Sequence, residues 1–200
     1  AVAGAADSGT EVALKRCPSV AGDDKCADTA VLPSGGIAYL SGMPDVSYLT
    51  ALATTKSMTN LMTPLGYLTL TPKDVVQVKI FLKPVTSAEE VLREVQKSFP
   101  DQIMPPVVFV EWLASMPVEI EMIARLPLSD KPAEGVEYFD PPEYRQSNTF
   151  SRVALMRADR QIYISWLYAR KPSRGEPQAN DLFGRLKEIL KETGSDLRHL

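Results

Sequence analysis

Two neighbouring runs of sequence decide the fold: Pro105-Pro-Val-Val-Phe-Val-Glu-Trp112 and Met116-Pro-Val-Glu-Ile-Glu-Met-Ile-Ala124. Apolar residues fill one face of each run, and carboxylates recur on the other face. This pattern is typical of two β-strands, and the short stretch between them is typical of a turn. We therefore predict that the two runs form a hairpin.

The residues before this hairpin predict the rest of a mixed unit. The predicted elements are short strands at 30–33 and 36–41 around a Ser34-Gly35 turn, a helix from Val46 to Leu65 with Gly66 as its C-cap, a strand at 75–82, and a helix that opens with a capping box at 87–90 and ends at Pro100. The order β-β-α-β-α-β-β indicates a two-layer α+β fold with both helices on one sheet face. The other face is apolar through Val107 and Phe109, so we expect it to pack on another subunit or domain.

The pattern restarts near the end of the chain. We interpret residues 1–27 as an N-terminal tail or lead-in, 28–127 as a complete domain, and the proline-rich stretch 128–144 as a linker. Residues 145–200 predict strands at 150–156 and 161–165 and a helix from Asn180 that Gly194 ends. This is the first half of a second copy. Either more chain follows Leu200, which we favour, or the half unit packs on another copy.

Composition sets broad limits on function. The chain has 44% hydrophobic and 24% charged residues, which is ordinary for a globular protein, and no apolar run approaches the length of about 18 residues that spans a bilayer. Residues 1–144 carry 11 Lys and Arg against 19 Asp and Glu, whereas residues 145–200 carry 11 against 6. Opposite charges favour docking between the two parts, or between subunits, over a basic surface for an anionic ligand, and they make nucleic acid an unlikely partner.

Few residues suit metal or cofactor chemistry. The two cysteines, Cys17 and Cys26, have the spacing of neither a zinc site nor a redox pair. They form a disulfide in an exported protein, or they are two thiols, and the compartment stays open. His199 is the single histidine, which disfavours metal and histidine-based catalysis, and no glycine-rich loop indicates a nucleotide. We predict no cofactor.

Several short motifs, in this order, resemble the Rid family (RidA/YjgF-type, endoribonuclease L-PSP-like). They are Ala38-Tyr-Leu-Ser-Gly42, Asn60-Leu61 with Gly66, Asp74-Val-Val-Gln-Val-Lys-Ile-Phe81, Pro105-Pro106 and Val118-Glu-Ile-Glu-Met-Ile-Ala124, with Ile162-Tyr-Ile-Ser165, Gln178-Ala179 and Gly194 in the second copy. The resemblance covers residues 28–127 fully and 145–200 in part. It implies a chorismate-mutase-like α+β fold, a trimer or a trimer-like ring of domains, and hydrolysis of enamines and imines derived from amino acids.

The resemblance also implies a site. Glu119 and Ser41 correspond to catalytic positions that handle the attacking water, and Gly42, Val107, Phe109 and Glu111 fall in the substrate-binding region. At Val107 the family usually carries an arginine that holds a substrate carboxylate, and at Phe109 often a cysteine. Loss of such charge-assisted bonds removes about 1.5–3 kcal/mol each. We expect a small carboxylate to bind poorly unless Arg125 or an arginine of residues 145–200 takes over.

Three functions remain open at this point. The first is a divergent Rid-like protein that hydrolyses enamines or imines, or binds a small metabolite, at an interdomain cleft. In that case Glu119 is a general acid or base whose pKa burial raises; otherwise it is one of the solvent-facing residues of an alternating strand. The second is a catalytically silent domain that supports oligomerisation. The third and most distant is a ribonuclease, which the negative charge and the single histidine disfavour.

Overall fold

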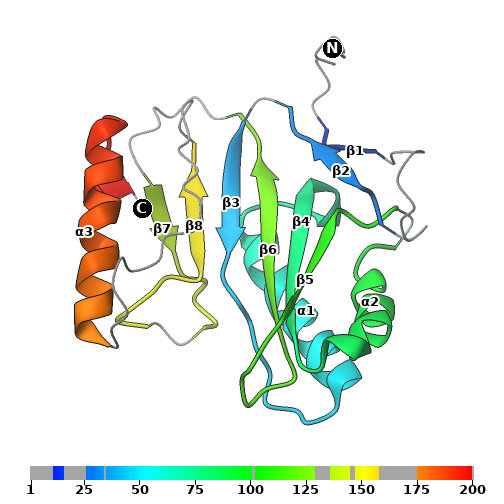
Figure 1. Cartoon of the computed structure of the whole chain (residues 1–200). Helices are drawn as coiled ribbons and strands as arrows, with labels where there is room; N and C mark the ends of the chain where they lie inside the picture. Colours follow the sequence, from blue (N-terminus) through cyan, green and yellow to red (C-terminus); the bar gives the residue numbers. More distant parts are fainter. Residues whose placement is uncertain are drawn as a thin grey trace. The chain divides into compact units, whose positions relative to one another are not determined.

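The computed structural model describes residues 11–15, 26–33, 35–100, 102–128, 136–144, 147–157 and 175–199 (Figure 1). The chain divides into two compact units. The first comprises Ala1–Pro132 and Glu137–Met156, and the second comprises Ala133–Val136 and Arg157–Leu200. The first unit contains the sheet and the candidate site. No helix in the described residues is long and apolar enough to cross a membrane, and these residues contain no cluster of three or more metal-ligand side chains.

The first unit is built on a six-stranded sheet with the order β5-β4-β6-β3-β8-β7. The strands are β3 (Gly36–Leu40), β4 (Val75–Leu82), β5 (Val107–Glu111), β6 (Val118–Leu126), β7 (Val136–Phe139) and β8 (Val153–Met156). Strand β4 runs parallel to β5, whereas the β4–β6, β6–β3 and β3–β8 pairs are antiparallel. The predicted α+β class is thereby confirmed.

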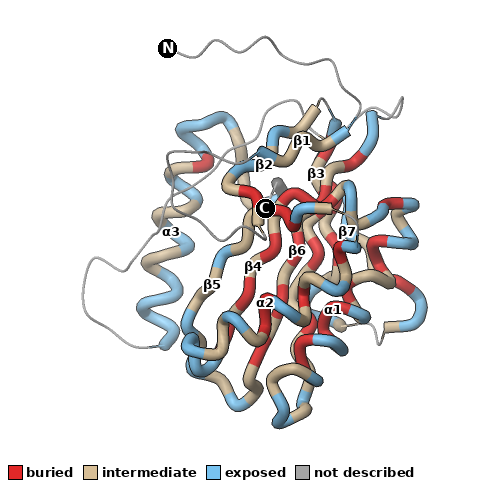
Figure 2. The backbone as a smooth tube through the Cα atoms, turned by 90° about the vertical axis from the view of Figure 1, so that its right-hand side faces the viewer, coloured by how far each residue is buried: buried red, intermediate tan, exposed pale blue. Residues whose placement is uncertain are grey.

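Helices α1 (Thr50–Tyr67) and α2 (Ala88–Gln96) cover one face of this sheet, and short 3₁₀ turns lie at Pro72–Asp74 and Val85–Ser87 (Figure 1). The burial pattern of β6 explains why only one face is covered, because its residues alternate strictly between buried and half-buried. The buried set faces the helices and consists of Val118, Ile120, Met122, Ala124 and Leu126, each at most 2% exposed. In Figure 2 the buried positions concentrate along the central strands and on parts of α1 and α2.

The predicted hairpin of β5 and β6 is wrong in its pairing, although both strands exist. Strand β4 lies between them, so β5 follows α2 as the second strand of a parallel β4-α2-β5 crossover. Alternation of apolar residues reports which face of a strand is buried, and it carries no information about the strand's neighbours. A parallel crossover and a hairpin therefore looked alike in the sequence.

The other predicted hairpin, at residues 30–41, is also wrong. Strand β2 (Thr29–Val31) pairs with β1 (Ala13–Lys15) from the predicted tail, and the edge of β3 pairs with β8 instead. Gly35 has φ +153°, and a Cβ there would lie 2.2 Å from the carbonyl oxygen of Leu126, so the main chain passes close against the end of β6. Val153 and Leu155 of β8 then place buried apolar side chains opposite Leu40 and Ala38.

The ends of the helices differ in detail from the expectations. Gly66 lies inside the last turn of α1, and Thr69 adopts the left-handed conformation beyond it, with φ 58°. Ser87 is the N-cap of α2 but makes no side-chain capping bond. The second unit contains α3 (Glu176–Glu192) and a 3₁₀ turn at Leu197–His199. Helix α3 starts before Asn180, because Gly175 and the proline after Glu176 initiate it, and Gly194 follows its end with φ 77° as predicted.

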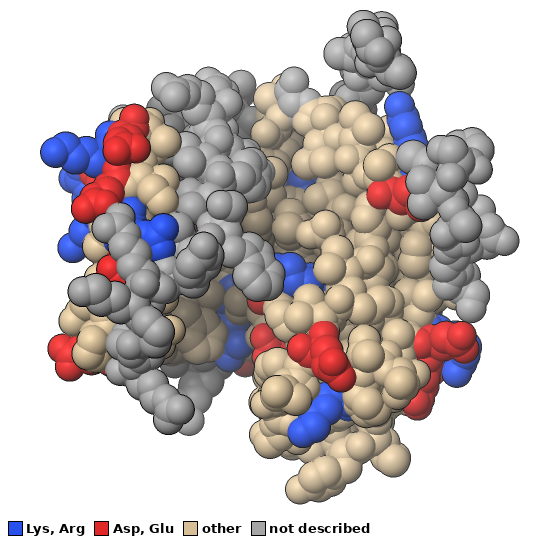
Figure 3. Space-filling view, in the orientation of Figure 1, with Lys and Arg blue, Asp and Glu red and all other residues tan. Residues whose placement is uncertain are grey.

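The sheet face that the helices leave open is less apolar than expected. Val107 and Phe109 pair in register with the buried Val78 and Ile80 and pack against the core beneath the helices, so their assignment to the open face is wrong. The residues of the open face on β3, β4 and β6 are Ile37, Tyr39, Gln77, Lys79, Phe81, Glu119, Glu121, Ile123 and Arg125. Figure 3 shows charged side chains as scattered groups among other residue types in the described part of the surface.

The segment interpreted as a linker contains β7, and the one interpreted as a tail contains β1. Strand β8 confirms the strand predicted at 150–156, but it belongs to the sheet of the first unit. The predicted strand at 161–165 and Cys17 lie outside the described residues, so the choice between a Cys17–Cys26 disulfide and two thiols stays open. The tandem repeat therefore stays a prediction.

Candidate active site

Two adjoining cavities open where β3 ends and β6 begins, and they share Ser41 and Phe150. The first has a volume of about 530 Å³ and is lined by Ser41, Gly42, Met43, Pro44, Asn60, Glu119, Tyr144, Phe150 and Arg152. The second has a volume of about 420 Å³ and is lined by Tyr39, Leu40, Ser41, Lys79, Glu121, Met122, Ile123, Tyr138, Phe150, Ser151 and Ala154. All these residues belong to the first unit. A cavity of either size accommodates a small metabolite.

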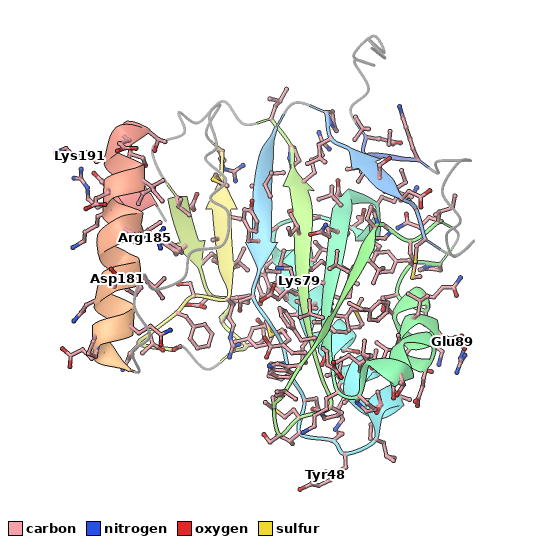
Figure 4. All side chains as sticks on the ribbon, in the orientation of Figure 1. Tyr48, Lys79, Glu89, Asp181, Arg185 and Lys191 are labelled. Carbon is pink, nitrogen blue, oxygen red and sulfur yellow. The ribbon has the colours of Figure 1, made fainter. Side chains whose placement is uncertain are left out.

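Glu119 is the carboxylate of the first cavity. It is the second residue of β6 and lies opposite Phe81 on the open sheet face. No described cation pairs with it, whereas Glu121 two positions on forms an ion pair with Lys79, whose Nζ lies 3.0 Å from its Oε2. Figure 4 labels Lys79 over the middle of the sheet. Burial, and then the charge of Glu121, raise the pKa of Glu119.

Gly42 makes room for this carboxyl group. A Cβ at Gly42 would lie 2.0 Å from Oε1 of Glu119 and 2.5 Å from its carboxyl carbon. The carboxyl group therefore lies directly over the main chain after β3. The Cβ of any other residue type at position 42 would clash with it.

Ser41 contributes a hydroxyl group with no partner. Its Oγ is buried and makes no hydrogen bond within the described chain. Its main-chain N–H donates to the carbonyl oxygen of Arg152 at 2.8 Å, which continues the β3–β8 pairing to the rim of the cavity. A buried hydroxyl without a partner is costly, and a ligand or a water molecule in the cavity satisfies it.

Arg152 is the cation of the first cavity. Its Nε is buried without a hydrogen-bond partner, and no carboxylate of the described chain pairs with its guanidinium group. The guanidinium carbon lies 4.9 Å from the centre of the Phe150 ring, and Nη1 donates a weak hydrogen bond to Met43 Sδ at 4.0 Å. The main-chain N–H of Arg152 donates to Oδ1 of Asp140 at 2.7 Å.

Tyr144 and Asn60 close another side of the first cavity. The hydroxyl group of Tyr144 donates to the carbonyl oxygen of Asn60 in α1 at 2.5 Å, and the ring packs against the core. This bond ties the segment after β7 to the helix layer. Tyr144, Phe150 and Arg152 therefore form a wall of the cavity, and hydrogen bonds hold it at Tyr144 and, through Asp140, at Arg152.

The structure brings three of the predicted site residues together, namely Ser41, Gly42 and Glu119. Val107, Phe109 and Glu111 line neither cavity: the first two pack against the core, and Glu111 is exposed at the end of β5. Arg125 pairs with Asp74, with 3.7 Å between Nη1 and Oδ1, and lines neither cavity.

Sequence reasoning missed Arg152, Tyr144 and Asn60 as members of one site. The arginines of residues 145–200 were candidates for a substitute cation, but no local pattern distinguishes Arg152 among them. Only the pairing of β8 with β3 carries it to the cavity, and that pairing joins segments far apart in the sequence.

No family model and no curated protein matches this chain. Among solved structures, the Rid family protein YyfB from Yersinia pestis, of unknown function, matches with a TM-score of 0.51 at 16% identity, over 58% of this chain and 99% of that chain. A YjgF/YER057c/UK114 family member from Mycobacterium tuberculosis matches with a TM-score of 0.41 at 20% identity, over 57% and 99% of the two chains. A candidate endoribonuclease L-PSP from Entamoeba histolytica matches with a TM-score of 0.43 at 20% identity, over 58% and 98%. At such identities the likeness concerns the fold, and on the match to YyfB this chain has the fold of the Rid protein family.

Proposed function

We propose that the first cavity binds a small molecule and hydrolyses an imine or enamine, with Glu119 as its general acid and base. The observation that carries the proposal is the position of Glu119 in the cavity: it lies over Gly42, has no described cation partner, and has a raised pKa. A raised pKa makes the carboxylate a better proton acceptor than an ordinary glutamate, which suits a group that accepts and returns a proton during the reaction.

The chemistry follows from these groups. The substrate enters as the iminium ion, its nitrogen protonated from solvent. Water adds to the carbon of the C=N bond while the carboxylate of Glu119 accepts a proton from that water, which gives a neutral carbinolamine. The resulting carboxyl group passes its proton to the amine nitrogen. The C–N bond then breaks while the carboxylate takes the hydroxyl proton, so a carbonyl compound and ammonia leave and Glu119 returns the last proton to solvent. An enamine enters the same path after its carbon is protonated. The unpartnered hydroxyl of Ser41 can hold the water in place.

The test compares three proteins on imines generated from several amino acids. We expect turnover by the wild type and a loss of about 10²–10⁴-fold in Glu119→Gln, which keeps the shape of the side chain and removes its proton chemistry. The matched control is Glu89→Gln, because the Glu89 side chain is 94% exposed on α2 (Figure 4). Equal rates in Glu119→Gln and the wild type would remove Glu119 from the mechanism.

Assembly is the second candidate function. The open sheet face carries half-buried apolar side chains such as Tyr39, Phe81 and Ile123 between its charges, and a second copy of the chain would cover them. We propose an oligomer, of trimeric or ring-like form, which sedimentation equilibrium tests directly. Turnover on no substrate together with a stable oligomer would favour the assembly role. Cleavage of single-stranded RNA that Glu119→Gln abolishes would instead favour a nuclease.

A further inference from the structure

We propose that Arg152 is the anion anchor of the first cavity and that the ligand carries a single carboxylate group. This inference deepens the function proposed above and rests on it for the reaction, although not for binding. It reverses the expectation from Val107 that carboxylate recognition is lost in this chain.

The first argument is the missing counter-charge of the guanidinium group. Arg152 is half-buried, its Nε is buried without a hydrogen-bond partner, and no carboxylate of the described chain pairs with the group. An anion in the cavity would supply the missing partner of Nε and the missing counter-charge. Glu119 lines the same cavity but forms no ion pair with Arg152.

The second argument is rigidity. The main chain of Arg152 is held on both sides, by the bond from Ser41 to its carbonyl oxygen and by the bond from its N–H to Asp140. The guanidinium group also lies against the Phe150 ring. A planar fork that is held before binding loses little entropy when it receives the two oxygens of a carboxylate.

The third argument is charge. Among the described residues that line the first cavity, Arg152 is the one cation and Glu119 the one acid. A single carboxylate is balanced by Arg152 alone, whereas a phosphate group would carry a second negative charge that no further cation of this described lining meets. The same lining separates the two tasks, since Arg152 holds the anion and Glu119 faces the reacting end of the ligand over Gly42.

Equilibrium titrations followed by calorimetry test the inference without turnover. The probes are pyruvate, its methyl ester and inorganic phosphate, and the proteins are the wild type, Arg152→Gln, Arg152→Lys and the control Arg93→Gln, whose side chain is 57% exposed on α2. We expect pyruvate to bind the wild type and Arg93→Gln alike, and to bind Arg152→Gln about 10- to 100-fold more weakly. Arg152→Lys, which keeps the charge and loses the fork, should fall between them.

Folding does not confound the comparison, because both main-chain bonds of Arg152 survive a side-chain substitution, and thermal unfolding of each variant checks this. Equal pyruvate affinity in Arg152→Gln and wild type overturns the inference, as do tighter binding of phosphate than of pyruvate and failure of the wild type to bind pyruvate at millimolar concentration. If Arg152-dependent binding is found but no imine is hydrolysed, the anchor stands and the proposed reaction fails. If Glu119→Gln abolishes turnover and Arg152→Gln leaves it unchanged, the proposed reaction stands and the anchor role of Arg152 fails.

Discussion

At Gly42 the main chain lies in contact with the carboxyl group of Glu119, so a methyl group there should act on chemistry more than on stability. Gly42→Ala would place a Cβ 2.0 Å from Oε1, and the flexible end of the glutamate would move away. We expect imine turnover to fall at least about tenfold, because a misplaced catalytic group loses its alignment. Thermal unfolding should change little. A variant with full activity would show that the carboxyl group need not occupy this position.

Glu119 also makes a prediction about pH. Its pKa is higher in the folded protein than in the unfolded chain, because burial and Glu121 disfavour the charged form. The stabilising contribution is therefore complete below the ordinary titration range of a glutamate and is lost as the pH rises through the raised pKa. Relative to Glu119→Gln, the wild type should lose free energy of unfolding over this interval in urea titrations. A constant difference between the two proteins would contradict the assignment.

Among the elements, β6 offers a paired test of the layer arrangement. Ile120 is fully buried beneath the helices, whereas Ile123 is half-buried on the open face. Ile120→Ala should lower the free energy of unfolding by about 2–5 kcal/mol, and Ile123→Ala by clearly less. Urea unfolding measures both. Equal losses would mean that another surface covers the open face.

The end of α1 gives a second prediction at this scale. Thr69 is exposed and has φ 58°, a conformation that is strained for a β-branched residue. Thr69→Gly should therefore raise the free energy of unfolding by about 1 kcal/mol. Thr59→Gly, at an exposed position inside the same helix, should lower it by a few tenths of a kcal/mol. Loss of stability in both variants would contradict the strain argument.

The elements also show how far the sequence leads. Alternation in β4 and β6 predicted the strands, and spacing predicted the helices, because burial of one face imposes a period on each element. The neighbours of β5 and β3 could not be predicted, since pairing depends on contacts between distant segments. Gly66 was a plausible helix end, yet Thr69 takes the left-handed position instead. The preference of glycine for helix ends is a property of one residue type, whereas the residue that ends α1 depends on how the surrounding chain packs.

At the scale of the whole molecule, some residues of the site could be predicted from the sequence and others could not. Ser41, Gly42 and Glu119 lie in or beside elements that the sequence predicts, and the family resemblance already brought them together. Arg152 and Tyr144 reach the cavity from segments interpreted as a second copy and a linker, and only the extension of the first sheet by β7 and β8 places them. Val107, where the family resemblance led us to expect an arginine, packs against the core and lines neither cavity.

The pairing of β8 with β3 has a consequence for biosynthesis. Ser41 leaves the ribosome early, but its main-chain N–H cannot form its hydrogen bond until Arg152, whose carbonyl oxygen accepts it, has been translated. A nascent chain stopped before Asp140 could assemble β4, α2 and much of the core, yet its first cavity would lack Tyr144, Phe150 and Arg152.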